Sequence, residues 1–256
     1  MVKGLSYQGQ RCVLEHVEAC KRIHITARST VLRKFEKSIP LCVSYLHLDS
    51  HFLSVNTVRI EDRYHNVIFK NNGKEVCKRK ITRKRKHQQA LGYPTNAMFK
   101  YFLGGRSSIL VDRLEIHARL GNSDLPENLK IQVNHLDTDY HKFSRYLPFI
   151  DSKSFPLKKL RTAINRPEDF DNPVINSPEC LALQFSWKVF SVSVSDMDKV
   201  HSKTVILRGL KEVKIVDLVK HWRKNGKKVG TTFMYPRHSA EAIKIYLARV
   251  NEELRE

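Results

Sequence analysis

Several residue patterns that mark common protein classes are missing from this 256-residue chain. Its five cysteines are odd in number and contain no C-x-x-C pair, which argues against a disulfide framework and a structural zinc site. No apolar run approaches the ~18–20 residues that a membrane span needs. The first eight residues lack the apolar core of a secretory signal, and no N-x-S/T glycosylation acceptor occurs. We therefore expect an intracellular protein, cytoplasmic or nuclear or both, without a membrane partner.

Sequence motifs of enzymes are also missing. The chain has no G-x-S-x-G elbow, no H-E-x-x-H helix and no Walker-type loop. Residues 226–232, GKKVGTT, follow a predicted helix and have closely spaced glycines, so we interpret them as a helix C-cap and turn. His47 and His51 are four apart on a predicted strand, a spacing that does not converge on a metal, and His135 and His141 fall on different elements. We expect no enzyme activity, no metal and no cofactor.

Positive charge is what the chain has in excess: 46 Lys and Arg face 26 Asp and Glu, a net charge of +20. The density peaks in residues 78–87, here called the basic block, which contains Lys78, Arg79, Lys80, Arg83, Lys84, Arg85 and Lys86. Such a block repels itself and is expected to be exposed. One interpretation is a solvated insertion without a dedicated partner. The other is an import signal or a contact with nucleic-acid phosphates.

Leucines recur in the second half of the chain at nearly constant intervals, as Leu114, Leu136, Leu160, Leu183 and Leu207. They belong to an apolar-x-x-Leu-x-apolar pattern, and Leu46 fits the same pattern earlier in the chain, before the basic block. The alternation predicts short strands with one buried face. The mean step of roughly 23 residues lies in the range of leucine-rich repeats, which place one strand per repeat in a parallel sheet.

Between these strands the apolar spacing favours helices. We expect one helix from Pro94 to Leu103, one with Tyr140, Phe143, Leu147 and Ile150 on one face, one around 215–222 and one over 240–254. Residues 50–75 instead predict a hairpin or small meander, with Asn71-Asn72-Gly73 as a turn. The predicted fold class is α/β, an irregular leucine-rich-repeat-like layer of short strands and helices preceded by an N-terminal helical module. The repeats lack the Asn of regular leucine-rich repeats, which argues against a regular horseshoe.

The first forty residues are helical in pattern, and three stretches of the chain resemble one family. The run Leu5–Ile25, LSYQGQRCVLEHVEACKRIHI, continued by residues 32–34 and 36–41, resembles the start of the Caenorhabditis F-box-associated proteins of the F-box C group. Residues 218–233, LVKHWRKNGKKVGTTF, resemble the closing motif of that family, and residues 152–158, SKSFPLK, resemble a middle block. The shared domain of that family has no established activity.

The resemblance implies a division into residues 1–40, a divergent F-box-like helical module, and residues 41–256, an F-box-associated α/β domain with a basic insertion around 56–93. An F-box docks on the Skp1-type adaptor of cullin–RING ubiquitin ligases, and by that analogy Leu5, Val13, Leu14 and Val17 would contribute to the adaptor-facing surface. Ser6 and Gln8 stand where F-boxes commonly have prolines, so a retained structural cap is the other interpretation. The implied function is a non-catalytic substrate-recognition adaptor with an unknown protein target. The alternative is a nuclear or nucleic-acid-associated protein that acts through the basic block.

Overall fold

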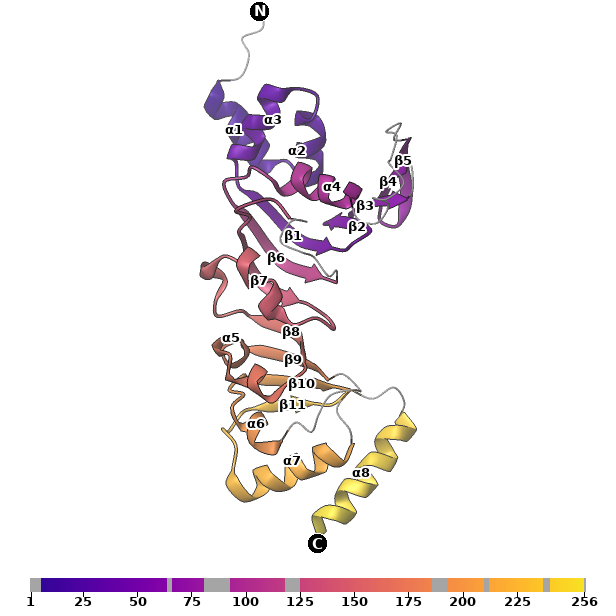
Figure 1. The fold of residues 1–256 in the computed structure, drawn as a ribbon, viewed down its shortest axis with the longest axis vertical. Coiled ribbons are helices and arrows are strands. Elements are labelled where there is room, and N and C mark those ends of the chain that lie inside the picture. The colour runs from indigo at the N-terminus through magenta and orange to yellow at the C-terminus, as the bar shows by residue number, and fades with distance from the viewer. Residues whose placement is uncertain are drawn as a thin grey trace, which may run out of the picture. The chain divides into compact units, whose positions relative to one another are not determined.

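The computed structural model describes residues 6–63, 66–80, 93–117, 125–185, 193–209, 212–236 and 240–255 (Figure 1). The fold is mixed α/β. The helices are α1 (Tyr7–His16), α2 (Ala19–Thr26), α3 (Thr30–Ser38), α4 (Tyr93–Leu103), α5 (Pro173–Asn176), α6 (Val194–Asp198), α7 (Glu212–Asn225) and α8 (Ala240–Arg255). The strands are β1 (Leu41–Leu48), β2 (Phe52–Val55), β3 (Val58–Arg63), β4 (Asn66–Asn71), β5 (Lys74–Lys80), β6 (Ile109–Ile116), β7 (Ile131–Asp137), β8 (Lys159–Ile164), β9 (Cys180–Phe185), β10 (Thr204–Arg208) and β11 (Thr232–Met234).

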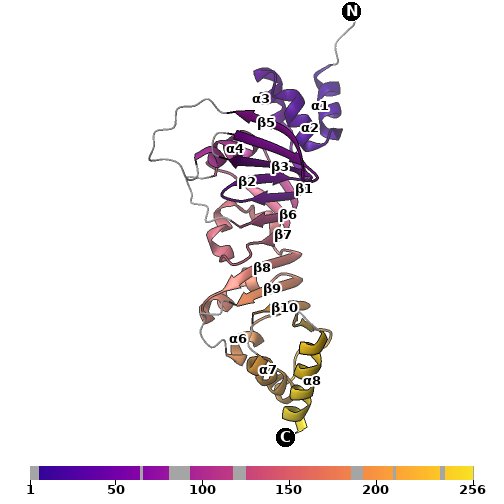
Figure 2. The same cartoon turned by 90° about the vertical axis from the view of Figure 1, so that its right-hand side faces the viewer.

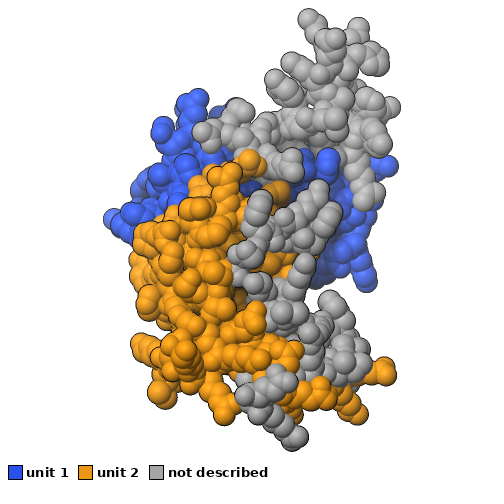
Figure 3. All heavy atoms as spheres, turned by 60° about the horizontal axis from the view of Figure 1, so that its bottom comes forward, with its two compact units in different colours: residues 1–134, 146–154 blue, residues 135–145, 155–256 orange. Residues whose placement is uncertain are grey.

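The eleven strands in the described part of the chain have the hydrogen-bonded order β11-β10-β9-β8-β7-β6-β1-β2-β3-β4-β5. The chain divides into two compact units, coloured separately in Figure 3. Unit 1 consists of Met1–Asn134 and Tyr146–Ser154, and unit 2 of His135–Arg145 and Phe155–Glu256. The N-terminal helices and the strand that follows them both belong to unit 1. A separate domain over residues 1–40 stays a prediction.

Unit 1 combines a parallel strand pair with an antiparallel meander. β1 pairs with β6 in parallel, although the meander β2–β5 and the helix α4 come between them in sequence (Figure 2). The predicted meander over residues 50–75 is thus confirmed. Asn72 and Gly73 have φ of 49° and 79°, and this two-residue turn with positive φ suits the twist of the β4–β5 hairpin.

Both β1 and β6 carry two consecutive side chains outside the core, Ser44-Tyr45 and Asp112-Arg113, in the middle of the strand. The inner face therefore changes from odd to even positions at the same level in both strands. The buried residues are Leu41, Val43, Leu46 and Leu48 in β1, and Ile109, Val111, Leu114 and Ile116 in β6. The apolar-x-x-Leu-x-apolar pattern arises from this change, because two consecutive non-core residues separate the buried residues before it from those after it. We call the opposite surface of these strands the outer face.

Unit 2 contains a parallel ladder in which each strand lies beside the next one in sequence. The periodic leucines are confirmed as core residues: Leu136 pairs with Leu160 and Leu183 with Leu207, and all four are at most 2% exposed. α8 contacts α7. α7 ends at Asn225 and Gly226 follows with a φ of 77°, as the predicted C-cap requires.

The predicted helix over residues 140–150 is wrong. The structure has two 3-10 turns instead, Phe143–Arg145 and Leu147–Phe149. Phe143, Tyr146 and Phe149 are buried and repeat every three positions as a 3-10 helix does, and Ile150 is buried directly after the second turn. Tyr140, assigned to the buried helix face, is 65% exposed. Pro148 has no N–H to donate and so cannot support a continuous α-helix here.

No helix within the described ranges is both long enough and apolar enough to cross a bilayer.

Candidate functional site

The three short N-terminal helices of unit 1 begin at side chains that accept hydrogen bonds from free backbone N–H groups. Ser6 accepts from the N–H of Gly9 before α1, and Ser29 accepts from the N–H of Leu32 before α3. Glu18 accepts from the N–H of Cys20 at 2.9 Å and from that of Lys21 at 3.1 Å before α2. Such caps are needed because isolated helices of 8 to 10 residues are marginal in water.

Glu18 also connects α2 to the sheet of unit 1. Its Oε1 accepts a hydrogen bond from Asn56 Nδ2 at 3.0 Å, and Asn56 Oδ1 accepts from the backbone N–H groups of Ser44 and Tyr45. Burial acts to raise the pKa of Glu18, but the hydrogen bonds from Asn56 and from the backbone outweigh it and lower the pKa. Burial, followed by the charge of Glu18, raises the pKa of the neighbouring Cys20 to about 12.

A buried charge triad fixes the helices to the rest of unit 1. Glu36 of α3 accepts from Arg22 Nε of α2 at 3.0 Å and from Arg106, in the connection between α4 and β6, at 2.8 Å. All three side chains are at most 4% exposed. Arg22 also donates to the carbonyl of Pro40 at 3.0 Å, and Arg106 to that of Phe102 at 2.6 Å. The helices thus have a polar anchor beside the few apolar side chains that they bury, Ala19 and Ile23 of α2.

This arrangement leaves apolar side chains of the helices in solvent. All residues of α1 are described and none is buried, and Glu36 is the one buried residue of α3. Five large apolar residues on the three helices are exposed, here called the apolar patch: Tyr7 (63%), Val13 (49%), Ile25 (54%), Val31 (74%) and Leu32 (38%). Residues 6–40 carry seven Lys or Arg and three Glu, so the surroundings are basic. Each of the three helices thus presents at least one large apolar side chain to solvent, where a partner could cover it.

The sequence predicted only part of the apolar patch. Val13 is exposed, Leu14 and Val17 are half-buried, and Leu5 lies outside the described residues. Tyr7, Ile25, Val31 and Leu32 are not among the surface residues that the resemblance implies, and their apolar character alone does not distinguish an exposed position from a buried one. Three short helices cannot bury all of their apolar side chains against one another. This limit on helix packing is the signal in the first forty residues that some of these side chains are exposed.

The basic block begins inside a strand. Residues 78–80 belong to β5, where Lys78 is exposed, while Arg83, Lys84, Arg85 and Lys86 lie outside the described residues. Within the described part of the chain β5 is the last strand at its end of the sheet.

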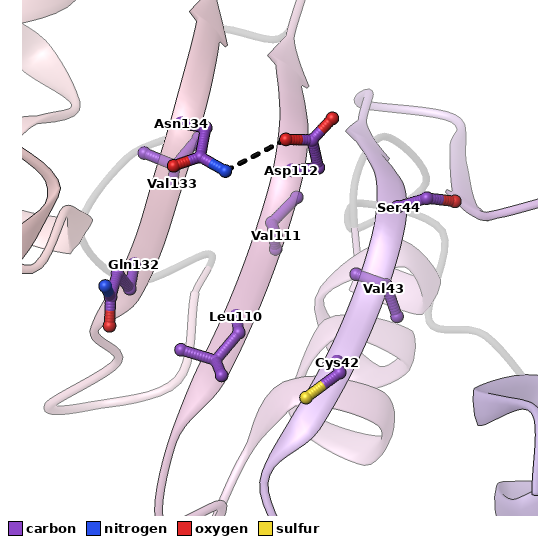
Figure 4. Close-up of a pocket in the computed structure, with 9 residues that line it drawn as sticks. All are labelled: Cys42, Val43, Ser44, Leu110, Val111, Asp112, Gln132, Val133 and Asn134. Atoms are coloured by element: carbon purple, nitrogen blue, oxygen red, sulfur yellow. Dashed lines mark hydrogen bonds between the residues drawn. The ribbon is translucent and has the colours of Figure 1, made fainter. Parts of the chain in front are cut away.

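A shallow groove of about 470 Å³ lies on the outer face of unit 1 (Figure 4). Its exposed lining comes from alternate residues of three strands: Cys42, Ser44, Leu110, Asp112, Gln132 and Asn134. Asn134 Nδ2 donates to Asp112 Oδ1 at 2.9 Å. The lining offers amide, hydroxyl and carboxylate groups beside Leu110, a mixture that suits a peptide or protein surface.

A family model described as Domain of unknown function (DUF3557) matches residues 94–236, from α4 to the segment after β11. No curated protein and no solved structure matches the chain.

Proposed function

The chain belongs to the family of the domain of unknown function DUF3557, and from this premise we propose that it is a substrate-recognition adaptor of a Skp1–cullin–F-box ubiquitin ligase. In this proposal α1–α3 are a divergent F-box that docks on a Skp1-type adaptor. The parallel strands form an irregular leucine-rich-like layer that selects a protein target. The chain contributes no chemistry itself, because its ligase partners transfer the ubiquitin. The resemblance of residues 5–41 to the Caenorhabditis F-box C group supports this assignment.

The apolar patch is the observation that carries the proposal. A helical module that only capped the sheet would bury its large apolar side chains and expose its charges. Here Val31 and Tyr7 are mostly exposed, whereas Arg22 and Glu36 are buried. Covering apolar surface contributes about 25 cal/mol for each Å² removed from water, so a complex in which the partner covers the patch is stabilised by several kcal/mol. The basic surroundings favour an acidic partner surface.

The outer groove is the proposed contact for the target. Its lining from β1, β6 and β7 belongs to rigid strands, which hold recognition groups in fixed positions. Asp112 and Asn134 are bonded to each other, and the Ser44 hydroxyl donates to Asn56, so a target gains most by bonding to Gln132 and by covering Leu110.

Co-purification tests the adaptor docking. We expect the full chain to recover a Skp1-type adaptor and a cullin, and the double variant Val13→Asp, Val31→Asp to lose both. These positions are exposed, so the substitutions leave the fold intact. The matched control is Val229→Asp, because Val229 is 98% exposed and lies in the turn after α7. Recovery that is equal for wild type and the double variant would reject docking through α1–α3.

The alternative function is nucleic-acid binding by the basic block, and it is favoured by Lys78, a block residue that is exposed in β5. It predicts that log K for duplex DNA falls steeply with log salt, and that neutralising four block residues reduces the slope. The variant replaces Arg83, Lys84, Arg85 and Lys86 by Gln. The control replaces four exposed lysines elsewhere by Gln: Lys158, Lys159, Lys203 and Lys228. An equal loss of binding in both variants would show that only net charge matters.

A further inference from the structure

Two histidines and a glutamate meet on the outer face of unit 1. His47 of β1 and Glu115 of β6 are cross-strand partners, and His117 follows β6 and continues the ladder by donating its N–H to the carbonyl of Leu48. One ligand atom from each of the three side chains lies within 4.8 Å of the other two. His47 Nδ1 is 3.5 Å from Glu115 Oε2. The register of the parallel pair therefore creates a His₂Glu cluster.

Neighbouring side chains hold the cluster in place. The Tyr45 hydroxyl donates to Glu115 Oε2 at 2.7 Å and lies 3.2 Å from His47 Nδ1. The ring of Phe52 packs against that of His47, with centroids 4.7 Å apart. Arg113 forms an ion pair with Glu115 Oε1, the other carboxylate oxygen. The side chains of His47 and Glu115 are 13% and 10% exposed, so their positions are largely fixed by packing.

Both histidines have a nitrogen without a partner. Nε2 of His47 and Nε2 of His117 are buried and make no hydrogen bond within the described part of the chain. Buried polar atoms are nearly always paired, because losing water without gaining a partner costs free energy. The two rings are neighbours, with centroids 4.5 Å apart. Two unpaired imidazole nitrogens at one place therefore call for an explanation.

The chemistry of the donor atoms favours a transition metal. The cluster offers imidazole nitrogens of two histidines beside a carboxylate oxygen. Nitrogen and oxygen ligands of these kinds are typical of transition-metal sites in proteins.

We propose that His47, Glu115 and His117 bind a divalent transition-metal ion, with Zn²⁺ as the best fit. Ligands at about 2.0–2.2 Å around a tetrahedral ion lie about 3.4 Å apart, and one ligand atom from each of the three side chains already lies within 4.8 Å of the other two. The imidazoles disfavour Ca²⁺ and Mg²⁺, which take oxygen ligands. Three protein ligands leave a fourth position for water or a target side chain. This site is independent of the proposed adaptor docking.

Zinc affinity tests the proposal. The full chain is stripped with a chelator, and Zn²⁺ binding is measured by competition with a chromophoric chelator. We expect one tightly bound ion per chain and a loss of at least about 100-fold in the double variant His47→Ala, His117→Ala, since even removal of a supporting residue costs about 10–100-fold. Tyr45→Phe should lose about 10-fold. His51→Ala is the matched control, because His51 is exposed and only four residues from His47. Equal affinity in the double variant and wild type would overturn the site.

A measurement on the unaltered protein covers the case in which the double variant does not fold. X-ray absorption at the zinc edge of the loaded wild-type chain should give nitrogen and oxygen ligands with the signature of two imidazoles. Sulfur ligands would place the ion on cysteines and overturn the proposal. Absence of a bound ion after equilibration with Zn²⁺ would overturn it as well.

Discussion

Removing Glu36 should destabilise unit 1 strongly, because its carboxylate is the partner of two buried guanidinium groups. Contacts of 3.0 and 2.8 Å correspond to a gross attraction of about 5–6 kcal/mol each at an effective dielectric constant of about 20. Desolvation offsets most of this attraction in the intact triad. Glu36→Ala loses the attraction and leaves Arg22 and Arg106 buried without their carboxylate. We expect a loss of about 3–5 kcal/mol, a large part of the ~5–15 kcal/mol that stabilises a typical domain.

Two probes separate the units in a urea titration. Trp222 of α7 falls in unit 2, where its ring packs against that of Phe233, so in a Trp187→Phe background the fluorescence follows that unit. Hydrogen exchange of peptides from α2 and α3 follows unit 1. In Glu36→Ala the exchange midpoint should fall by roughly 2 M urea. Glu15→Gln is the control: its pair with Arg11 is 41–49% exposed, and exposed pairs contribute at most about 0.5 kcal/mol.

A third variant separates charge from packing. Replacing Arg22 and Arg106 by Met and Glu36 by Leu removes the whole triad and keeps similar volume, and such replacements are often neutral or stabilising. If this triple variant unfolds as easily as Glu36→Ala, the loss comes from packing and the electrostatic reasoning is refuted. A cost below about 1 kcal/mol for Glu36→Ala would refute it too.

Three further predictions concern single residues. Cys20 should react with iodoacetamide far more slowly at pH 8.5 than the exposed Cys12, as measured by peptide mass spectrometry, because burial raises the pKa of Cys20 to about 12; equal rates would contradict this. Burial acts to raise the pKa of Asp169, but the hydrogen bonds that it accepts lower it, so its stabilisation is present above pH 3.8 and is lost as the pH falls through the lower folded value. Asp169→Asn should lower the free energy of unfolding by about 1–2 kcal/mol at pH 7. In urea titrations at a series of pH values, that free energy should also fall less steeply below pH 3.8 than in the wild type. Asn56 has a φ of 52° and accepts three hydrogen bonds, so Asn56→Ala should be less stable in urea than Asn56→Gly by about 1 kcal/mol; equal stability would show that backbone strain is not involved.

The strands were predictable because burial repeats with the period of the backbone. The nearly constant leucine spacing places Leu136, Leu160, Leu183 and Leu207 on successive strands. The spacing of the apolar residues in β1 and β6 likewise shows where the buried side of both strands changes from odd to even positions. The helix predicted over residues 140–150 is wrong because the spacing of Tyr140, Phe143, Leu147 and Ile150 fits a period of 3.6 residues. The chain instead forms 3-10 turns that bury large side chains at three-residue steps.

The histidine cluster was not predicted because it depends on pairing between distant segments. In sequence the nearest histidine to His47 is His51, which lies outside the cluster. The sequence offset that relates Leu46 to Leu114 also relates His47 to Glu115, so applying it to the polar positions would have found the pair. The apolar patch was missed for a different reason: whether an amphipathic helix buries its apolar face depends on what packs against it, and three short helices anchored by charges bury little.

The two sheet edges within the described residues suggest how the chain avoids association with copies of itself. An unpaired strand is a template for intermolecular β-sheet formation. β11 is only three residues long, and so presents few free backbone groups. β5 is seven residues long and exposes Val76, but Lys74 and Lys78 flank this residue. A second copy that pairs with this edge would bring like charges close together. The lysines of β5 therefore oppose aggregation through this edge, whether or not the basic block has a partner.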